Sequence, residues 1–159
     1  TLADGTPFNE SDKVRPGEKI VTVETELGVF GMSICYDVRF PEQFRLMQQR
    51  GVKAVVLPAS FNRTTGPAHW ELLMRARALD QEMYVLGCAA AGDLAGSYNG
   101  WGHSIAVDPW GTIMEELGEG PGMLMAAVDF AKADAVRSQI PVLQQLRTDI
   151  YEVCEKTVG

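Results

Sequence analysis

Alternating and continuous apolar stretches divide the first third of the chain into elements. The segment KIVTVETELGVFGMSIC alternates apolar and polar residues before Gly28 and is almost wholly apolar after it, which predicts two strands, about 20–24 and 29–35, joined by a tight turn. RFPEQFRLMQQRG follows with helical character, since Pro41 suits a first helical turn and Gly51 suits a helix end. VKAVVLPAS then predicts a short buried strand. This order predicts a βαβ unit with parallel strands.

The later part of the chain repeats this order and then changes. PAHWELLMRARALDQEM predicts a second helix and YVLGCAA a further strand. GHSIAVDPWG and TIMEELGEGPGMLMAAVDF predict two or three short antiparallel strands, turned near Asp108 and by the glycine cluster at 118–122. The last segment begins as a helix and is interrupted at Pro141, which predicts a C-terminal arm over 137–159.

Composition limits the class of protein. The 159 residues, 46% hydrophobic and 22% charged, predict a single α/β domain over 1–159. A net charge of −7 argues against a nucleic-acid partner or an anionic membrane surface. The chain has no apolar run long enough to span a bilayer, and TLADGTPFNESDK lacks the features of a signal peptide, so we expect a cytoplasmic protein.

The three cysteines are Cys35, Cys88 and Cys154. An odd number at distant positions favours reduced thiols over a disulfide framework, and no CxxC pair or histidine cluster indicates a metal. Cys88 lies within a predicted strand and Cys154 in the tail, so structural roles are expected for both.

Cys35 is the candidate nucleophile. It is predicted to be the last residue of a strand, and ligands of parallel α/β sheets bind beyond the carboxyl ends of strands. A following helix favours thiolate over thiol there. Tyr36, Asp37 and Arg39 crowd the same exit. The alternative is a buried cysteine that acts as a small hydrophobic residue.

A cysteine nucleophile needs a base, and the residue pattern leaves its identity open. The two histidines, His69 and His103, are candidates, although either would also suit an ordinary hydrogen-bonded role. The carboxylates nearest to predicted element ends are Glu10, Asp37, Glu42 and Glu71.

Four blocks in order carry a family resemblance: GMSICYDVRFPE, LPASFNRTTGPAHWELLMRARALDQEMYV, GHSIAVDPWG and VRSQIPVLQQLRTDIY. Together they resemble the carbon-nitrogen hydrolase family, the nitrilase superfamily, from about Phe8 to Val153. Within the family, FNRTTGPAHWELL is most similar to the omega-amidase branch. The resemblance implies a nitrilase-like four-layer α-β-β-α sandwich, of which this chain supplies roughly the C-terminal half.

The resemblance also implies roles for named residues. Cys35 matches the family's nucleophile, and Glu10 in TPFNES matches its second glutamate. The family's general-base glutamate and its lysine precede the segment that opens here with Thr1, so neither has a match. The backbone N–H of Tyr36, together with that lysine, would hold the oxyanion.

Three further residues are implied to bind substrate. Arg39 would pair with a substrate carboxylate, while Phe61 and Thr65 would wall and hydrogen-bond the same pocket. The alternative for Arg39 is a structural ion pair with Glu42 or Asp37. The alternative for Phe61 is a place in the core.

The expected function is hydrolysis of the terminal amide of a small dicarboxylate monoamide, of the 2-oxoglutaramate or 2-oxosuccinamate type, through a thioester at Cys35 with release of ammonia. One alternative is another substrate of the same chemistry: deaminated glutathione, a carbamoyl amine or a nitrile. Another is a catalytically silent fragment without the base and the lysine. The resemblance implies no cofactor, a homodimer, and an N-terminal half without which one sheet face is bare.

Overall fold

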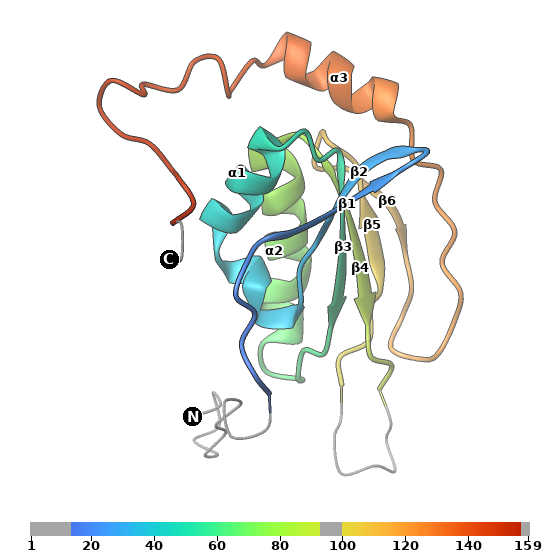
Figure 1. Cartoon of the computed structure of the whole chain (residues 1–159). Helices are drawn as coiled ribbons and strands as arrows, with labels where there is room; N and C mark the ends of the chain where they lie inside the picture. Colours follow the sequence, from blue (N-terminus) through green and yellow to red (C-terminus); the bar gives the residue numbers. More distant parts are fainter. Residues whose placement is uncertain (1–13, 93–99, 157–159) are drawn as a thin grey trace.

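A six-stranded mixed sheet forms the centre of the fold, with its strands in chain order from edge to edge. The computed structural model describes residues 14–92 and 100–156. The strands are β1 (Val21–Thr25), β2 (Gly28–Met32), β3 (Ala54–Ala59), β4 (Tyr84–Ala89), β5 (Ile105–Val107) and β6 (Ile113–Glu116), as Figure 1 shows.

Strand directions confirm the predicted βαβ units. β2, β3 and β4 are parallel, whereas β1, β5 and β6 join by antiparallel pairing. The prediction that the second strand extends to Cys35 is wrong, because β2 ends at Met32. The apolar run continues through Ile34, but there the chain turns into a 3-10 helix, η2 (Cys35–Arg39). No third strand follows β6 within the described residues.

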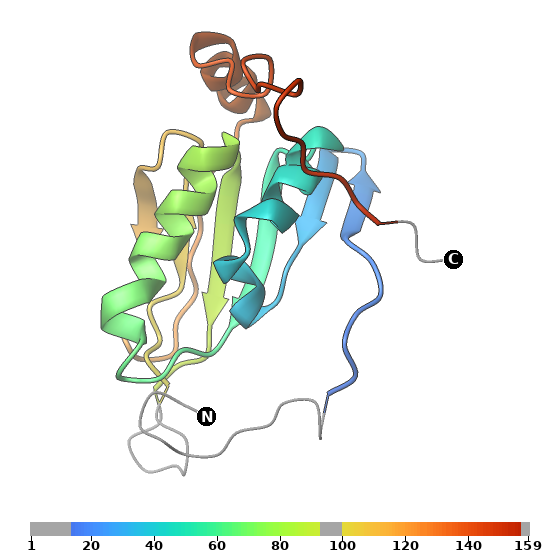
Figure 2. The same ribbon diagram turned by 90° about the vertical axis from the view of Figure 1, so that its left-hand side faces the viewer.

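Two α-helices cover one face of the sheet, α1 (Pro41–Gln49) and α2 (Gly66–Gln81) (Figures 1 and 2). As predicted, Pro41 opens α1, and Gly51 follows its end with φ +80°. The close approach of α2 depends on Gly87 in β4, where a Cβ would lie 2.4 Å from Met74 Cε. The core between these layers contains Phe44, Met47, Val55, Leu57, Trp70, Met74, Val85 and Ile105.

The third helix, α3 (Phe130–Gln139), lies at one end of the opposite face (Figure 1). Ala133 is buried there against Ala54 and Tyr84, and the Phe130 ring lies 5.5 Å from that of Phe30. α3 therefore covers the amino-terminal ends of the parallel strands and leaves their carboxyl ends open.

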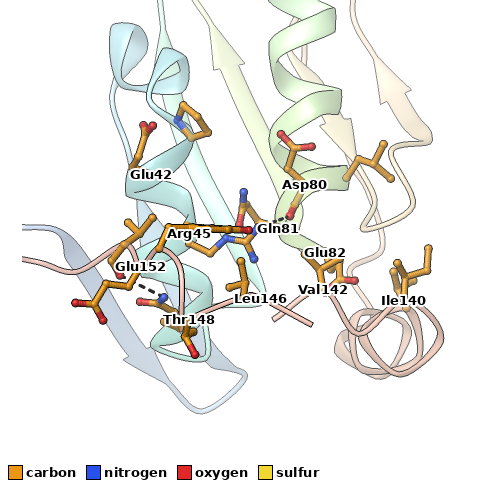
Figure 3. Close-up of a pocket in the computed structure, with 16 residues that line it drawn as sticks. Glu42, Arg45, Asp80, Gln81, Glu82, Ile140, Val142, Leu146, Thr148 and Glu152 are labelled. Atoms are coloured by element: carbon orange, nitrogen blue, oxygen red, sulfur yellow. Dashed lines mark hydrogen bonds between the residues drawn. The ribbon is translucent and has the colours of Figure 1, made fainter. Parts of the chain in front are cut away.

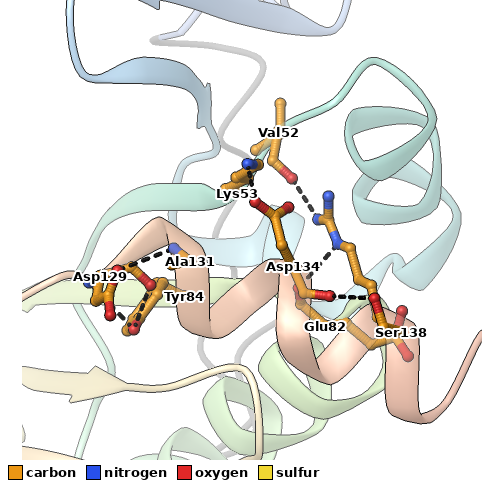
Figure 4. Close-up of polar contacts among 9 residues, drawn as sticks. Val52, Lys53, Glu82, Tyr84, Asp129, Ala131, Asp134 and Ser138 are labelled. Carbon is orange, nitrogen blue, oxygen red and sulfur yellow. Dashed lines mark hydrogen bonds and ion pairs between the residues drawn. The ribbon is translucent and has the colours of Figure 1, made fainter.

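Polar contacts fasten α3 to the body of the domain (Figure 4). Lys53 Nζ lies 2.6 Å from Asp134 Oδ2, and the guanidinium of Arg137 donates to the carbonyls of Val52 and Glu82 at 2.7 and 3.2 Å. Burial lowers the pKa of Arg137, although Glu82 and Asp134 oppose that effect. The helix is thus held at the β3 and β4 ends by backbone carbonyls as well as by charge.

Segment 140–156 contains no helix or strand and returns along α1 (Figures 1 and 2). Gln49 Nε2 donates to Val153 O at 3.4 Å, and Arg50 pairs with Glu155. The arm over 137–159 remains a prediction, since its last three residues lie outside the described part. None of the described helices is long and apolar enough to cross a membrane.

The rest of the face opposite α1 and α2 is apolar and open. Strand register places Val21 opposite Met32 and Val23 opposite Phe30 on this face. Val21, Val23, Met32 and Val56 are 40, 41, 47 and 38% exposed. A contiguous apolar surface of this kind marks an interface, as expected for one half of a layered sandwich.

We expect residues 1–159, expressed alone, to bind an apolar fluorescent dye through this open face. Val56→Thr, which adds a hydroxyl at the centre of the face, should reduce that binding, while Val14→Thr, at an exposed position outside the sheet, should leave it unchanged. Fluorescence titration with sedimentation measures both effects. A dye-silent monomer with cooperative unfolding would show that the face needs no partner.

Glu82 gives a pH-dependent prediction. This nearly buried residue ends α2 in the left-handed region, with φ +51°, and accepts from Gln48 Nε2 at 3.2 Å. Burial raises its pKa, and the nearby Arg137 and Arg45 only partly oppose this. Because the native pKa is raised, ionising Glu82 costs native stability as pH rises from the unfolded pKa through the native one.

Glu82→Gln keeps an acceptor for Gln48 and removes the charge. We expect it to increase the free energy of unfolding at about pH 7 and to lose that advantage towards about pH 4, near the unperturbed value for glutamate. Urea unfolding across this pH range tests the effect, with exposed Glu24→Gln as control. A Gln variant that is less stable at about pH 7 contradicts the assignment.

Candidate active site

Cys35 lies just past the carboxyl end of β2, in an unusual backbone conformation. Its φ is +47°, in the left-handed region that non-glycine residues rarely adopt. Such strain costs about 1–3 kcal/mol and is concentrated at functional sites. Cys35 is thus the first residue of η2 and not the last residue of a strand, which corrects the prediction. The nearest helix N-terminus is that of η2, because α1 begins only at Pro41.

A reciprocal pair of hydrogen bonds makes this turn. Ile34 N–H donates to Asp37 Oδ2 at 2.9 Å, and Asp37 N–H donates to Ile34 O at 3.0 Å. The carboxylate of Asp37 therefore shapes the loop around Cys35. This geometry gives Asp37 a structural task in place of the candidate role of base.

Arg77 anchors η2 to α2. Its Nε donates to Val38 O at 2.8 Å, and the Val38 side chain is fully buried. Burial lowers the pKa of Arg77, while Asp80 at 3.2 Å raises it. The residue pattern does not predict this bond, because it joins a side chain to a backbone carbonyl 39 positions away.

The turn carries two donor groups, the Tyr36 N–H and the Cys35 thiol. Within the described part of the chain, the Tyr36 N–H has no acceptor, as an oxyanion donor requires. The Cys35 Sγ–H lies 3.8 Å from Ser60 O, just past the end of β3. Ser60 and Cys35 thus bring the ends of two parallel strands together.

Arg39 is half-buried and meets mainly aromatic rings. Its Cζ lies 5.2 Å from the ring centre of Tyr36 and 5.4 Å from that of Phe61. Nη2 lies 3.4 Å from His69 Nδ1. Among the described residues no carboxylate pairs with this guanidinium, so the alternative ion pair with Glu42 or Asp37 is not observed.

Phe61 lies in the core and also contacts Arg39. It is only 6% exposed and packs on Trp70 with ring centres 5.0 Å apart, which places it in the core. The same ring also faces Arg39. It therefore supports the guanidinium from within the core.

Thr65 lies at the start of α2, in a turn built by Asn62. Asn62 Oδ1 accepts the Thr64 and Thr65 N–H groups at 3.0 and 2.8 Å, and also the Thr65 hydroxyl at 3.0 Å. In this arrangement the hydroxyl accepts from a ligand but does not donate to one. Asn62 was not among the predicted site residues, although an Asn before a helix is a known capping signal.

Residues after β3 make close contacts with Trp101 and Glu119. Arg63 makes two bonds to Glu119, at 2.6 and 2.7 Å, and this contact lowers the pKa of Glu119. Trp101 N–H donates to Phe61 O at 2.7 Å. A Cβ on Gly66 would lie 2.2 Å from Trp101, so glycine is required where α2 begins.

Among the described residues, the contacts of His103 and Glu71 are with residues other than Cys35. His103 stacks on Trp101 and pairs with Glu116 at 3.1 Å, and Glu71 pairs with Arg75 on the surface of α2. Cys88 and Cys154 are both exposed. Glu10 lies outside the described residues. Within the described part, no group of three His, Cys, Asp or Glu side chains could hold a metal.

A cavity of about 560 Å³ lies elsewhere, between α1, the end of α2 and segment 140–153 (Figure 3). Its lining includes Glu42, Arg45 and Leu146, but not Cys35 or Arg39. Gln81 Oε1 and Glu82 Oε1 have no partner among the described residues, yet each exposes less than 1 Å². Those two oxygens are therefore closed off from the cavity, which lies apart from the Cys35 loop.

Residues 2–138 match the family described as carbon-nitrogen hydrolase. The chain belongs to the carbon-nitrogen hydrolase family. It is 44% identical to the omega-amidase NIT3 of Saccharomyces cerevisiae over 150 residues, which are 94% of this chain and 52% of that protein. The chain therefore spans about half the length of the curated relatives it matches.

Solved structures agree with this assignment. The crystal structure of Saccharomyces cerevisiae Nit3 superposes with a TM-score of 0.83 at 45% identity, covering 87% of this chain and 51% of that one. An amidase from Nesterenkonia sp. AN1 superposes with a TM-score of 0.70 at 26% identity, covering 89% and 50%. That structure shows the acetamide moiety of fluoroacetamide added covalently at the active-site cysteine. These matches confirm the predicted family and fold, the latter as about half of a nitrilase-superfamily chain.

The left-handed backbone at Cys35 predicts an inverted stability order for two variants. Ala is ordinarily the more stable choice over Gly, but here Cys35→Gly should be more stable than Cys35→Ala by about 1 kcal/mol, because glycine adopts this φ without strain. Urea unfolding of the two thiol-free variants measures the difference. The ordinary order, with Ala more stable, would show that the native turn does not hold residue 35 in this region.

Proposed function

We propose that the protein containing this chain is an amidase that hydrolyses the terminal amide of a small dicarboxylate monoamide, of the 2-oxoglutaramate or 2-oxosuccinamate type. The observation that carries the proposal is the placement of Cys35, in a strained turn at the carboxyl edge of parallel strands, four residues before a guanidinium with no carboxylate partner among the described residues. A nucleophile and an anion site therefore belong to one short loop.

The proposed reaction has two covalent steps. The Cys35 thiolate attacks the amide carbon and forms a C–S bond, and the carbonyl electrons move to an oxyanion held by the Tyr36 N–H. The C–N bond then breaks, and the nitrogen leaves as ammonia with a proton from the general base. Water, deprotonated by the same base, hydrolyses the thioester to the carboxylic acid and returns the thiol.

This cycle needs two groups from outside the described residues. The family resemblance supplies them as a glutamate base and a lysine that shares the oxyanion with Tyr36, while Glu10 would orient that lysine. We propose that they lie in a further segment of the protein whose sheet packs on the open face around Met32 and Val56. The half-length match to the relatives supports this proposal.

Substrate choice would depend on Arg39. A guanidinium matches a carboxylate through two parallel N–H donors, and the ring contacts with Tyr36 and Phe61 use none of its hydrogen-bond donors. Thr65 would accept a hydrogen bond from a protonated substrate group, since its own proton goes to Asn62. An amide without a carboxylate would form no ion pair with Arg39.

We also propose that the protein is a homodimer. Leu72 and Leu79 are exposed on the outer side of α2, and Trp110 is exposed in the adjacent turn. Such a patch suits contact with a second copy, in line with what the family resemblance implies for this helix.

Ammonia release from 2-oxoglutaramate by the full protein tests the proposal. Cys35→Ala should reduce kcat at least about 1,000-fold, because no other group forms the thioester. Arg39→Lys should raise KM about 10-fold through loss of the two-pronged contact. Exposed Arg147→Lys is the matched control. Turnover that persists in Cys35→Ala would refute the mechanism, and an unchanged KM in Arg39→Lys would refute the substrate class.

A further inference from the structure

The contact between Arg39 and His69 joins the end of η2 to the first turn of α2. Arg39 Nη2 lies 3.4 Å from His69 Nδ1. A guanidinium carries donors only, so a hydrogen bond here requires Nδ1 to present its lone pair, with the imidazole proton on Nε2. His69 therefore serves Arg39 as an acceptor.

This contact is directional, unlike the others that Arg39 makes. The rings of Tyr36 and Phe61 attract the cation through their faces and leave it free to turn within its own plane. Among the described residues, His69 Nδ1 is the one hydrogen-bond acceptor for this side chain. The bond to the imidazole thus fixes the position of Nη2, which the ring contacts alone leave undetermined.

The imidazole itself is held by a well-defined helix start. His69 N–H donates to Thr65 O at 2.9 Å, within the turn that Asn62 caps. The next residue, Trp70, is buried and donates from Nε1 to His103 O at 2.6 Å. These bonds hold the His69 backbone in the first turn of α2, so the imidazole reaches Arg39 from a fixed position on the helix.

We infer that His69 is a positioning residue, which orients the Arg39 guanidinium to receive the carboxylate of the substrate. The inference rests on the proposed function for the identity of the substrate. His69 takes no part in the bond-breaking steps, because its recorded contact is with Arg39 and not with Cys35. It therefore affects the binding of carboxylate-bearing amides and leaves the thioester chemistry unchanged.

Three substitutions in the full protein separate orientation from packing. His69→Asn places an amide oxygen close to the position of Nδ1, His69→Gln moves that oxygen outward by one methylene, and His69→Leu removes the acceptor. Each variant is assayed with 2-oxoglutaramate and with pentanamide, which has the amide but no carboxylate. Calorimetric titration with glutarate gives a second readout that needs no turnover.

The inference predicts a selective effect on KM. For 2-oxoglutaramate, His69→Leu and His69→Gln should each raise KM about 10-fold and keep kcat within about 2-fold of wild type. The KM of His69→Asn should stay within about 3-fold of wild type. For pentanamide, KM should remain within about 2-fold in all three variants. The Kd for glutarate should follow the KM for 2-oxoglutaramate. If Leu fails to fold, the contrast between Asn and Gln decides.

Two results would overturn the inference: equal effects of Asn and Gln on 2-oxoglutaramate, or equal effects of a variant on both amides. Failure of the proposed function looks different. In that case the wild type releases no ammonia from 2-oxoglutaramate. The Kd for glutarate, measured by calorimetry, then tests the role of His69 by itself. Glutarate binding that is weakened by Gln and kept by Asn then supports its role, while the same Kd in all variants, or no binding, refutes it.

Discussion

The turn closed by Ile34 and Asp37 is the constraint on which the rest of the site depends. Two reciprocal hydrogen bonds between these residues end the apolar run of β2 and hold Cys35 at φ +47° between them. The turn also sets the direction of η2, whose last residue is Arg39. Without it, the strand would continue, and the Cα atoms of Cys35 and Arg39 would lie roughly 13 Å apart along it, at about 3.3 Å per residue.

The fold supports this turn from one side only. Arg77 on α2 donates a hydrogen bond to the Val38 carbonyl, and Trp70 and Met74 pack in the core beneath the turn. On the other side, the apolar surface around Val56 is open, and α3 covers only the far ends of the strands. Cys35 therefore lies between the buried core and an exposed apolar face that suits a second sheet. Under the proposed function, the base and the lysine would reach the thiol from that second sheet.

Local patterns predicted the elements but not their exact ends. The βαβ order and the helix start at Pro41 followed from periodicity and proline chemistry. The end of β2 did not, because Ile34 and Cys35 continue the apolar character beyond Met32 and the stop comes from a side-chain bond of Asp37. The contact between Arg39 and His69 joins residues 30 positions apart, and no local pattern encodes it. The family resemblance proposed Cys35, Arg39 and Phe61 as site residues, and their roles stay predictions. It could not show that the Thr65 hydroxyl donates its proton to Asn62 Oδ1.

The most direct measurement of the central claim is the order in which Cys35, Cys88 and Cys154 react with 2-chloroacetamide in the full protein, followed by peptide mapping and residual activity. Accessibility alone predicts that the exposed Cys88 and Cys154 react before the half-buried Cys35. If the turn makes Cys35 the nucleophile, Cys35 is alkylated first, activity is lost in proportion, and glutarate slows the reaction. Alkylation of Cys88 or Cys154 ahead of Cys35, or full activity after Cys35 is alkylated, would contradict the account.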